Sequence, residues 1–191
     1  NKLINEISLL ISNNDLETAK IKTTNIILKN PTNDIFYNIL GVINLKLKIY
    51  LEAIDNFERA IKINSKSISA IVNLGIAYQE INQIPEAITT YKKAIKINPE
   101  MYEVHNDLGL MYRKIDDLDS AIDHFNQCLK IKIDYDKAYF NLGTTYKKLN
   151  NFEKSLEYLN TTTKINPNNK GAYFEIGEIY RKQKNFNEAI K

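Results

Sequence analysis

The chain has a single cysteine, no tryptophan, six glycines and four prolines among its 191 residues. One cysteine, Cys128, excludes an internal disulfide framework and a cysteine-based zinc site. No apolar run approaches the ~18–20 residues that a membrane span needs. The net charge of +3 is too small to draw the chain strongly to nucleic acid or to an anionic membrane. We therefore expect no membrane association, no nucleic-acid partner and a cytoplasmic location.

Residues with catalytic chemistry are also scarce. The two histidines, His105 and His124, are not spaced to hold a metal together on one helix face. We expect His105 to pack and His124 to be solvated. No phosphate loop, dinucleotide fingerprint or nucleophile elbow is present, and Cys128 occupies a position that alanine holds elsewhere. The sequence predicts no active site, no enzyme activity, no cofactor and no metal.

An acidic cluster invites a calcium interpretation that its pattern does not support. Asp116, Asp117, Asp119 and Asp123 lie close together, but the glycine turn and terminal glutamate of the twelve-residue calcium loop are missing. A tight turn followed by a helix start explains these acids better.

What the chain does contain is a repeat. The stretch "EAITTYKKAIKINPE" (86–100) matches "EAIDNFERAIKINSK" (52–66) at an offset of 34 residues. Units of that length start at Asp34, Ile68, Tyr102, Asp136 and Lys170. The seventh and eighth positions of the units hold Leu40-Gly41, Leu74-Gly75, Leu108-Gly109, Leu142-Gly143 and Ile176-Gly177. The twentieth position holds Ala53, Ala87, Ala121, Ser155 and Ala189, and the twenty-fourth holds Phe57, Tyr91, Phe125 and Leu159.

The spacing of the apolar residues predicts two helices in each unit, of roughly 13 residues each. The pattern breaks around Asn82, Asp116 and Asn150, residue types that tolerate the left-handed backbone of a tight turn. A glycine inside a helix costs ~1 kcal/mol. The small residue at the twentieth position predicts that the two helices of a pair approach closely at that glycine. We expect the large rings at the twenty-fourth position to fill the gaps between successive pairs.

The chain resembles the tetratricopeptide repeat family. "NLGIAYQE" (73–80), "NDLGLMYRK" (106–114), "NLGTTYKK" (141–148) and the "EAI…AIKIN" segments carry the resemblance. It implies an all-α solenoid of about five to six repeats wound into a right-handed superhelix, with first helices on the concave side. We expect one array over 1–191, with a degenerate repeat at 1–33, full repeats at 34–67, 68–101, 102–135 and 136–169, and a truncated repeat at 170–191. Since the last repeat stops within its second helix, we expect the natural protein to continue.

A partner is expected on the outward positions of the first helices. The sixth position holds Asn73, Asp107 and Asn141, with Ile39 and Glu175 at the ends. Carboxamides spaced once per repeat can hydrogen-bond the backbone of an extended peptide, as the asparagine ladder of O-linked N-acetylglucosamine transferase repeats does. A solvated polar position is an equally open interpretation. Asn38, at the fifth position of the repeat at 34, is also expected to contact the partner.

Two further features of these helices have competing interpretations. Arg113, Lys147 and Arg181 at the twelfth position form a basic stripe that could attract an acidic peptide, or they simply complement helix C-termini. Apolar residues at the ninth position could face a ligand or pack against the next repeat. The carboxylate clamp of chaperone-binding relatives is absent, because Val42 does not fit it, and Glu103 and Asp107 stand where it needs Lys and Arg.

Two functional hypotheses follow. The first is a non-catalytic scaffold that binds a peptide or protein on its concave face. The alternative is the substrate-recruiting repeat region of a larger enzyme, such as a glycosyltransferase, whose catalytic domain lies outside this chain. RNA binding is disfavoured, since it would need a base-reading code and a stronger positive field.

Overall fold

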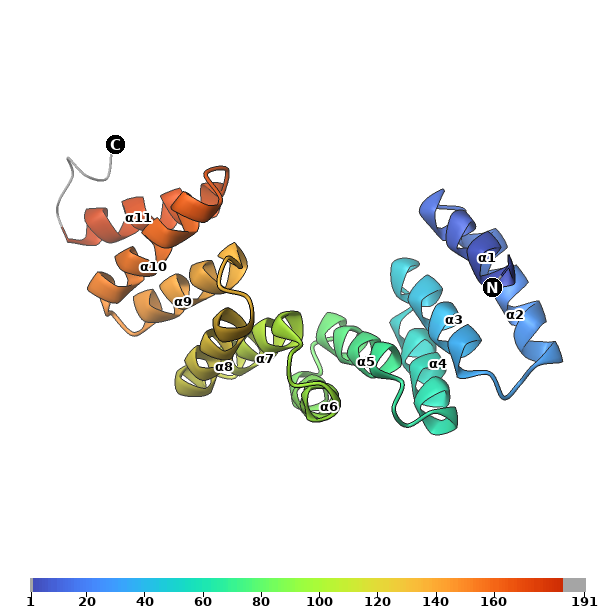
Figure 1. Cartoon of the computed structure of the whole chain (residues 1–191). Coiled ribbons are helices and arrows are strands. Elements are labelled where there is room, and N and C mark those ends of the chain that lie inside the picture. The colour runs from blue at the N-terminus through green and yellow to red at the C-terminus, as the bar shows by residue number, and fades with distance from the viewer. Residues whose placement is uncertain (1, 184–191) are drawn as a thin grey trace. The chain divides into compact units, whose positions relative to one another are not determined.

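The computed structural model describes residues 2–183, which form eleven α-helices and no strand (Figure 1). The all-α fold expected from the sequence is thus confirmed. The chain divides into two compact units, Asn1–Pro99 and Glu100–Lys191. The first unit contains α1 (Lys2–Ser12), α2 (Leu16–Lys29), α3 (Asp34–Lys46), α4 (Tyr50–Ile63), α5 (Ile68–Glu80) and α6 (Ile84–Ile97). The second contains α7 (Tyr102–Lys114), α8 (Leu118–Ile131), α9 (Asp136–Lys148), α10 (Phe152–Ile165) and α11 (Lys170–Lys182).

Helix length follows the sequence repeat. From α3 onward every first helix has 13 residues and every described second helix has 14. The first helices start at the residues where the repeat starts, from Asp34 to Lys170. The degenerate stretch 1–33 contains α1 and α2. The expected second helix of the last repeat, with Ala189, lies outside the described residues.

The turn inside each pair depends on one left-handed residue. Asn82, Asp116 and Asn150 have φ angles of 60°, 67° and 58°, as predicted. Asn14 and Lys48 adopt the same conformation in the first two pairs, and the sequence analysis did not identify them. Such a residue lets the chain reverse at once, because the next N–H can bond back into the helix. The Gln83 N–H, for example, donates to the Tyr78 carbonyl at 2.9 Å.

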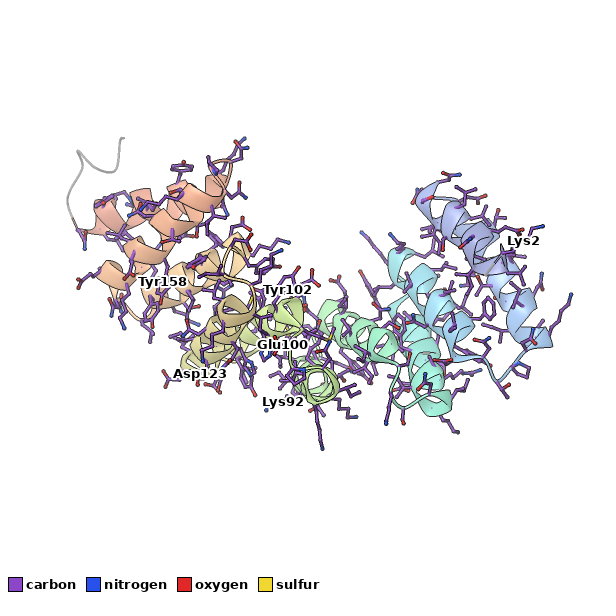
Figure 2. The ribbon with its side chains drawn as sticks, viewed as in Figure 1. Lys2, Lys92, Glu100, Tyr102, Asp123 and Tyr158 are labelled. Carbon is purple, nitrogen blue, oxygen red and sulfur yellow. The ribbon has the colours of Figure 1, made fainter. Side chains whose placement is uncertain are left out.

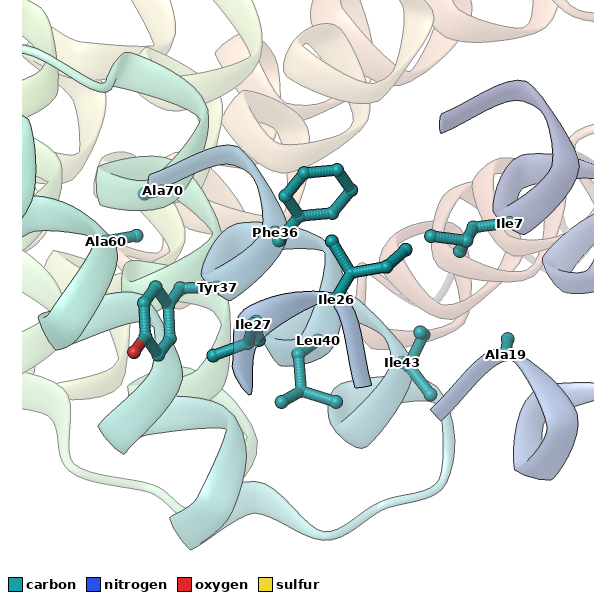
Figure 3. Packing of buried hydrophobic residues seen from close by; sticks show 10 residues of the cluster. All are labelled: Ile7, Ala19, Ile26, Ile27, Phe36, Tyr37, Leu40, Ile43, Ala60 and Ala70. Carbon is teal, nitrogen blue, oxygen red and sulfur yellow. The ribbon is translucent and has the colours of Figure 1, made fainter. Parts of the chain in front are cut away.

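The core is a series of side-chain layers between successive helices. In the first unit Ile7, Ile26, Phe36, Leu40 and Ile43 belong to one cluster contributed by α1 to α5 (Figure 3). The second unit builds smaller clusters around Phe125 and Leu159. The helices of each unit contact their neighbours in sequence, and first helices also contact the next first helix, as α3 does α5, α7 does α9 and α9 does α11. Each pair is therefore stabilised by the pairs beside it.

The repeated glycine has a different main neighbour from the one expected. A Cβ on Gly41, Gly75 or Gly109 would lie 2.4–2.5 Å from a ring carbon of Phe57, Tyr91 or Phe125 in the same pair. At Gly143 the neighbour is Leu159, with Cγ at 2.6 Å. The large residue at the twenty-fourth position, and not only the small one at the twentieth, requires the glycine. In one pair the residue at the twentieth position also contacts the glycine, since the Ser155 hydroxyl donates to the Gly143 carbonyl at 2.7 Å.

Candidate partner-binding surface

The seven predicted binding residues all lie on first helices. In each unit, we call the surface formed by the outward positions of its first helices the first-helix face; these helices are α3 and α5 in the first unit and α7, α9 and α11 in the second. The first unit contributes Asn38 on α3 and Asn73 on α5. The second contributes Asp107 and Arg113 on α7, Asn141 and Lys147 on α9, and Arg181 on α11.

The asparagines of the expected ladder are paired with other asparagines. Asn73 Nδ2 donates to Asn38 Oδ1 at 3.0 Å, and Asn141 Nδ2 donates to Asn106 Oδ1 at 2.8 Å. Both bonds join the fifth position of one repeat to the sixth position of the next, 35 residues away. These amides therefore tie neighbouring first helices together. Asn141 is also 7% exposed, so its side chain is largely inaccessible to a ligand.

Asn106 was missed as a site residue, although a signal for it existed. Asparagine stands at the fifth position only in the two repeats that precede an asparagine at the sixth, namely at Asn38 and Asn106. The spacing of 35 residues therefore marks both pairs. The repeat length of 34 residues does not connect the two members of either pair.

Asp107 lies beside the second amide pair and is partly buried. The pKa of its carboxyl group is raised to about 6, chiefly by burial and also by the nearby Glu103 charge, while the hydrogen bond from Asn106 and the charge of Lys137 act in the opposite direction. Within residues 2–183 no ion pair of Asp107 is found. This carboxylate can therefore accept hydrogen bonds from a ligand.

The basic stripe is engaged in internal contacts. Arg113 donates to the Thr144 hydroxyl in a very short hydrogen bond and to the Asn141 carbonyl at 3.5 Å. Burial lowers the pKa of its guanidinium group. Lys147 pairs with Glu175 of the next first helix at 2.5 Å. Arg181 pairs with Glu178 at 2.8 Å but keeps an exposed side chain. Two of the three cations thus link successive first helices, as the asparagine pairs do.

Sequence profiles of the tetratricopeptide repeat match most of the chain. One, described as "Tetratricopeptide repeat", matches 136–169, and another with that description matches 36–67, 102–133 and 171–191. A third, described as "TPR repeat", matches 80–116. The chain belongs to the tetratricopeptide repeat family. No closer likeness to the repeats of O-linked N-acetylglucosamine transferases is found.

Solved tetratricopeptide structures resemble this array over most of its length. The protein described as "YrrB: a TPR protein with an unusual peptide-binding site" is 26% identical, with a TM-score of 0.76, over 89% of this chain and 88% of that one. MamA is 21% identical with a TM-score of 0.79, over 83% of this chain and 93% of that one. PilW, a type IV pilus biogenesis factor, is 16% identical with a TM-score of 0.88, over 100% and 88%. No curated protein sequence matches the chain.

The reactive side chains of the array have packing and turn roles. The buried His105 places its Nδ1 3.2 Å from Nδ1 of His124. The expectation that His124 is simply solvated was wrong, because its ring stacks on Tyr112 with centroids 5.4 Å apart. Cys128 is buried, and burial raises the pKa of its thiol to about 12, which disfavours the reactive thiolate form.

The acidic cluster has the turn chemistry expected of it. The Ser120 N–H donates to the Asp117 side chain at 3.1 Å, and Asp116 pairs with Lys148 at 2.5 Å. The described residues contain no group of three or more His, Cys, Asp or Glu side chains suited to a metal ion. None of the described helices has the length and apolar character to cross a bilayer.

Residues at the ninth position pack within the array. Val42 and Leu110 are partly buried against the clusters around Phe57 and Phe125. Of the two interpretations, packing is the one these contacts support.

Proposed function

We propose that this array is a non-catalytic interaction scaffold that binds a peptide or protein partner on its first-helix face, the side that the family resemblance makes concave. The peptide-binding site described for YrrB, at 26% identity, supports a peptide as the ligand. Helical repeats offer extended surfaces of this kind. In this chain the first-helix face is held by bonds between repeats, which reduces the ordering cost of binding.

The observation that carries the proposal is the environment of Asp107. Its neighbours Asn106, Asn141 and Arg113 are all engaged with protein groups. Asp107, like Glu103 one turn earlier on α7, has acceptor capacity and no ion pair within residues 2–183. The surface there favours hydrogen-bond donors, so a ligand with lysine, arginine or free backbone N–H groups fits it better than an acidic one.

Peptide selection on the purified chain tests this function. A random twelve-residue peptide display library is panned against residues 1–191, and enriched peptides are synthesised and titrated by fluorescence anisotropy. We expect enriched peptides to carry a basic residue. We expect Asp107→Asn, which retains the size of the side chain, to weaken their binding at least tenfold at pH 7.5.

The matched control is Asp123→Asn, which removes the same charge from an exposed position on α8 (Figure 2). This variant should bind as the wild type does. A selection that enriches no peptide over a blocked surface, or equal losses in the two variants, would contradict binding at this face.

A further inference from the structure

Three aromatic positions bring their rings together within each of two pairs in the second unit. They are the fourth and eleventh positions of the first helix and the twenty-third position of the second helix. In the repeat at 136, Tyr158 stacks on Tyr146 with ring centroids 5.5 Å apart, and Tyr139 lies 6.3 Å away (Figure 2 labels Tyr158). In the repeat at 102 the rings are His105, Tyr112 and His124. Tyr158 also packs against the cluster of Ala121, Phe125 and Leu142. The groove beside α8 in this repeat holds a cavity of about 540 Å³, but its lining includes the polar residues Asp123, Asn126 and Gln127.

The repeat at 68 lacks two of these rings. Its three positions hold Ile71, Tyr78 and Thr90, so threonine stands where Tyr158 and His124 stand in the later repeats. A cavity of about 510 Å³ opens there between α4, α5 and α6, neighbouring helices of the first unit (Figure 1). Its apolar lining includes Ile61, Ile71 and Leu74, with Tyr78 at its side. The volume falls within the ~300–1,000 Å³ of ligand pockets.

The rim of this cavity is basic. Lys62 on α4 and Lys93 and Lys96 on α6 line it, and none of the three has an ion-pair partner within residues 2–183. The one acid of the lining, Glu58, accepts a hydrogen bond from the Tyr78 hydroxyl at 2.9 Å. The rim therefore carries a net positive charge around an apolar floor.

We propose that this cavity is a second binding site, separate from the first-helix face, which takes an aromatic side chain from an acidic peptide segment. The aromatic side chain replaces the ring that Thr90 leaves out. The flanking carboxylates meet Lys62, Lys93 and Lys96, whose charges are otherwise unbalanced at the surface. Although Ile71, Leu74 and Tyr78 lie on the first helix α5, none of the residues that line the cavity is among those assigned to the proposed function.

Titration with defined peptides tests the site. The probe is the peptide Glu-Glu-Phe-Glu-Glu, acetylated and amidated, added to the ¹⁵N-labelled chain and followed by NMR. We expect saturable shifts of the amide signals of Ile71, Leu74 and Thr90. Replacing the central phenylalanine by alanine should weaken binding at least tenfold, and so should replacing the four glutamates by lysines.

Two kinds of variant separate the floor from the rim. Thr90→Tyr restores the ring of the later repeats and should abolish the shifts, while circular dichroism confirms that the helices remain. The double variant Lys93→Glu/Lys96→Glu changes only exposed side chains and should weaken binding at least tenfold. Its matched control is Lys130→Glu/Lys164→Glu, which alters the same repeat position as Lys62 and Lys96 at residues that do not line this cavity. That control should bind as the wild type does.

Several outcomes would overturn the site. One is equal binding of the lysine peptide, and another is a Thr90→Tyr variant that still binds. Shifts of the same signals caused by phosphatidylglycerol vesicles or by raising the protein concentration, but not by the peptide, would assign the cavity to a lipid surface or to a second copy. Peptides selected on the first-helix face should bind Thr90→Tyr normally, so failure here leaves that function separately testable.

Discussion

Among single residues, glycine and its covering ring form the most constrained contact of each pair. The ring of Tyr91 occupies the space that a Cβ on Gly75 would need, with Cε1 at 2.5 Å and Cζ at 2.9 Å. Tyr91 is fully buried, so the ring has little room to move away. The glycine is retained despite its helix propensity because the packed ring contributes more than the ~1 kcal/mol that glycine costs.

Gly75→Ala is therefore expected to lower the free energy of unfolding by about 1–3 kcal/mol, the usual cost of overpacking. Urea denaturation followed by circular dichroism measures it. Gly171→Ala is the control, because its added Cβ would first meet Phe140 at 3.3 Å, the far end of a partly buried side chain. That variant should be neutral or slightly stabilising. Equal losses in both would show that the ring contact is not the cause.

Burial destabilises the ionised form of Asp107 in the folded chain, so the free energy of unfolding depends on pH. Its pKa is about 6 in the folded chain against 3.8 for an ordinary aspartate, chiefly through burial. Between these values the folded state binds more protons than the unfolded state, so this group's stabilising contribution is present below pH ~4 and is lost as the pH rises through 6. Asp107→Asn removes the dependence.

We expect the free energy of unfolding of Asp107→Asn, relative to wild type, to rise by about 1–3 kcal/mol between pH 4 and pH 7.5. Urea denaturation at both pH values measures the difference. In the exposed control Asp123→Asn the corresponding difference should stay within about 0.5 kcal/mol. A constant difference between Asp107→Asn and wild type would contradict the burial of this carboxylate.

At the level of helices and turns, each pair is closed by one residue in the left-handed region. Asparagine or aspartate fills that position in four of the five described turns, and Lys48 fills the fifth with φ 61°. A left-handed residue costs roughly 1–2 kcal/mol, and less for asparagine. The turn between α3 and α4 is thus the least favourable of the set in local backbone energy.

Lys48→Asn is expected to raise the free energy of unfolding by about 0.5–1 kcal/mol, measured from the urea midpoint. Lys46→Asn makes the same chemical change at an exposed residue inside α3 and should lower stability by about 0.5 kcal/mol, since asparagine is the poorer helix former. Changes of the same sign in both variants would show that side-chain chemistry, and not backbone conformation, decides the effect.

At the scale of the whole molecule, the described helices of each unit contact only helices that are near to them in sequence. In the first unit α4 contacts α3 and α5, and in the second unit α8 contacts α7 and α9. Phe57 on α4 and Phe125 on α8 are both fully buried, and each belongs to the core cluster of its own unit. A perturbation should therefore stay near its source, as in other repeat arrays.

Phe57→Ala is expected to accelerate amide hydrogen exchange in α3, α4 and α5, and Phe125→Ala in α7, α8 and α9. Each substitution removes about 3–5 kcal/mol of packing from its own cluster. Exchange followed by mass spectrometry measures both, and each variant serves as the other's control. Equal acceleration along the whole chain in either variant would indicate a single cooperative unit instead.

Much of the helical framework follows from local physical chemistry, and the sequence alone predicted it. The repeat of 34 residues places the starts of α3, α5, α7, α9 and α11, because apolar spacing defines a helix within a few turns. The turns at Asn82, Asp116 and Asn150 were likewise predictable from the backbone preference of one residue type. The turn at Lys48 was not, because lysine has no such preference and the surrounding helices impose the conformation.

The candidate surfaces depended on contacts that no local pattern contains. Asn73 and Asn141 lie one repeat after their partners Asn38 and Asn106, and Arg113 likewise donates to Thr144 of the next repeat. Only the packing of one first helix on the next brings these groups within hydrogen-bonding distance. The side chains that the sequence predicted to be available to a partner are therefore hydrogen-bonded within the protein. The cavity beside Thr90 arises in the same way, because its walls are side chains of three neighbouring helices.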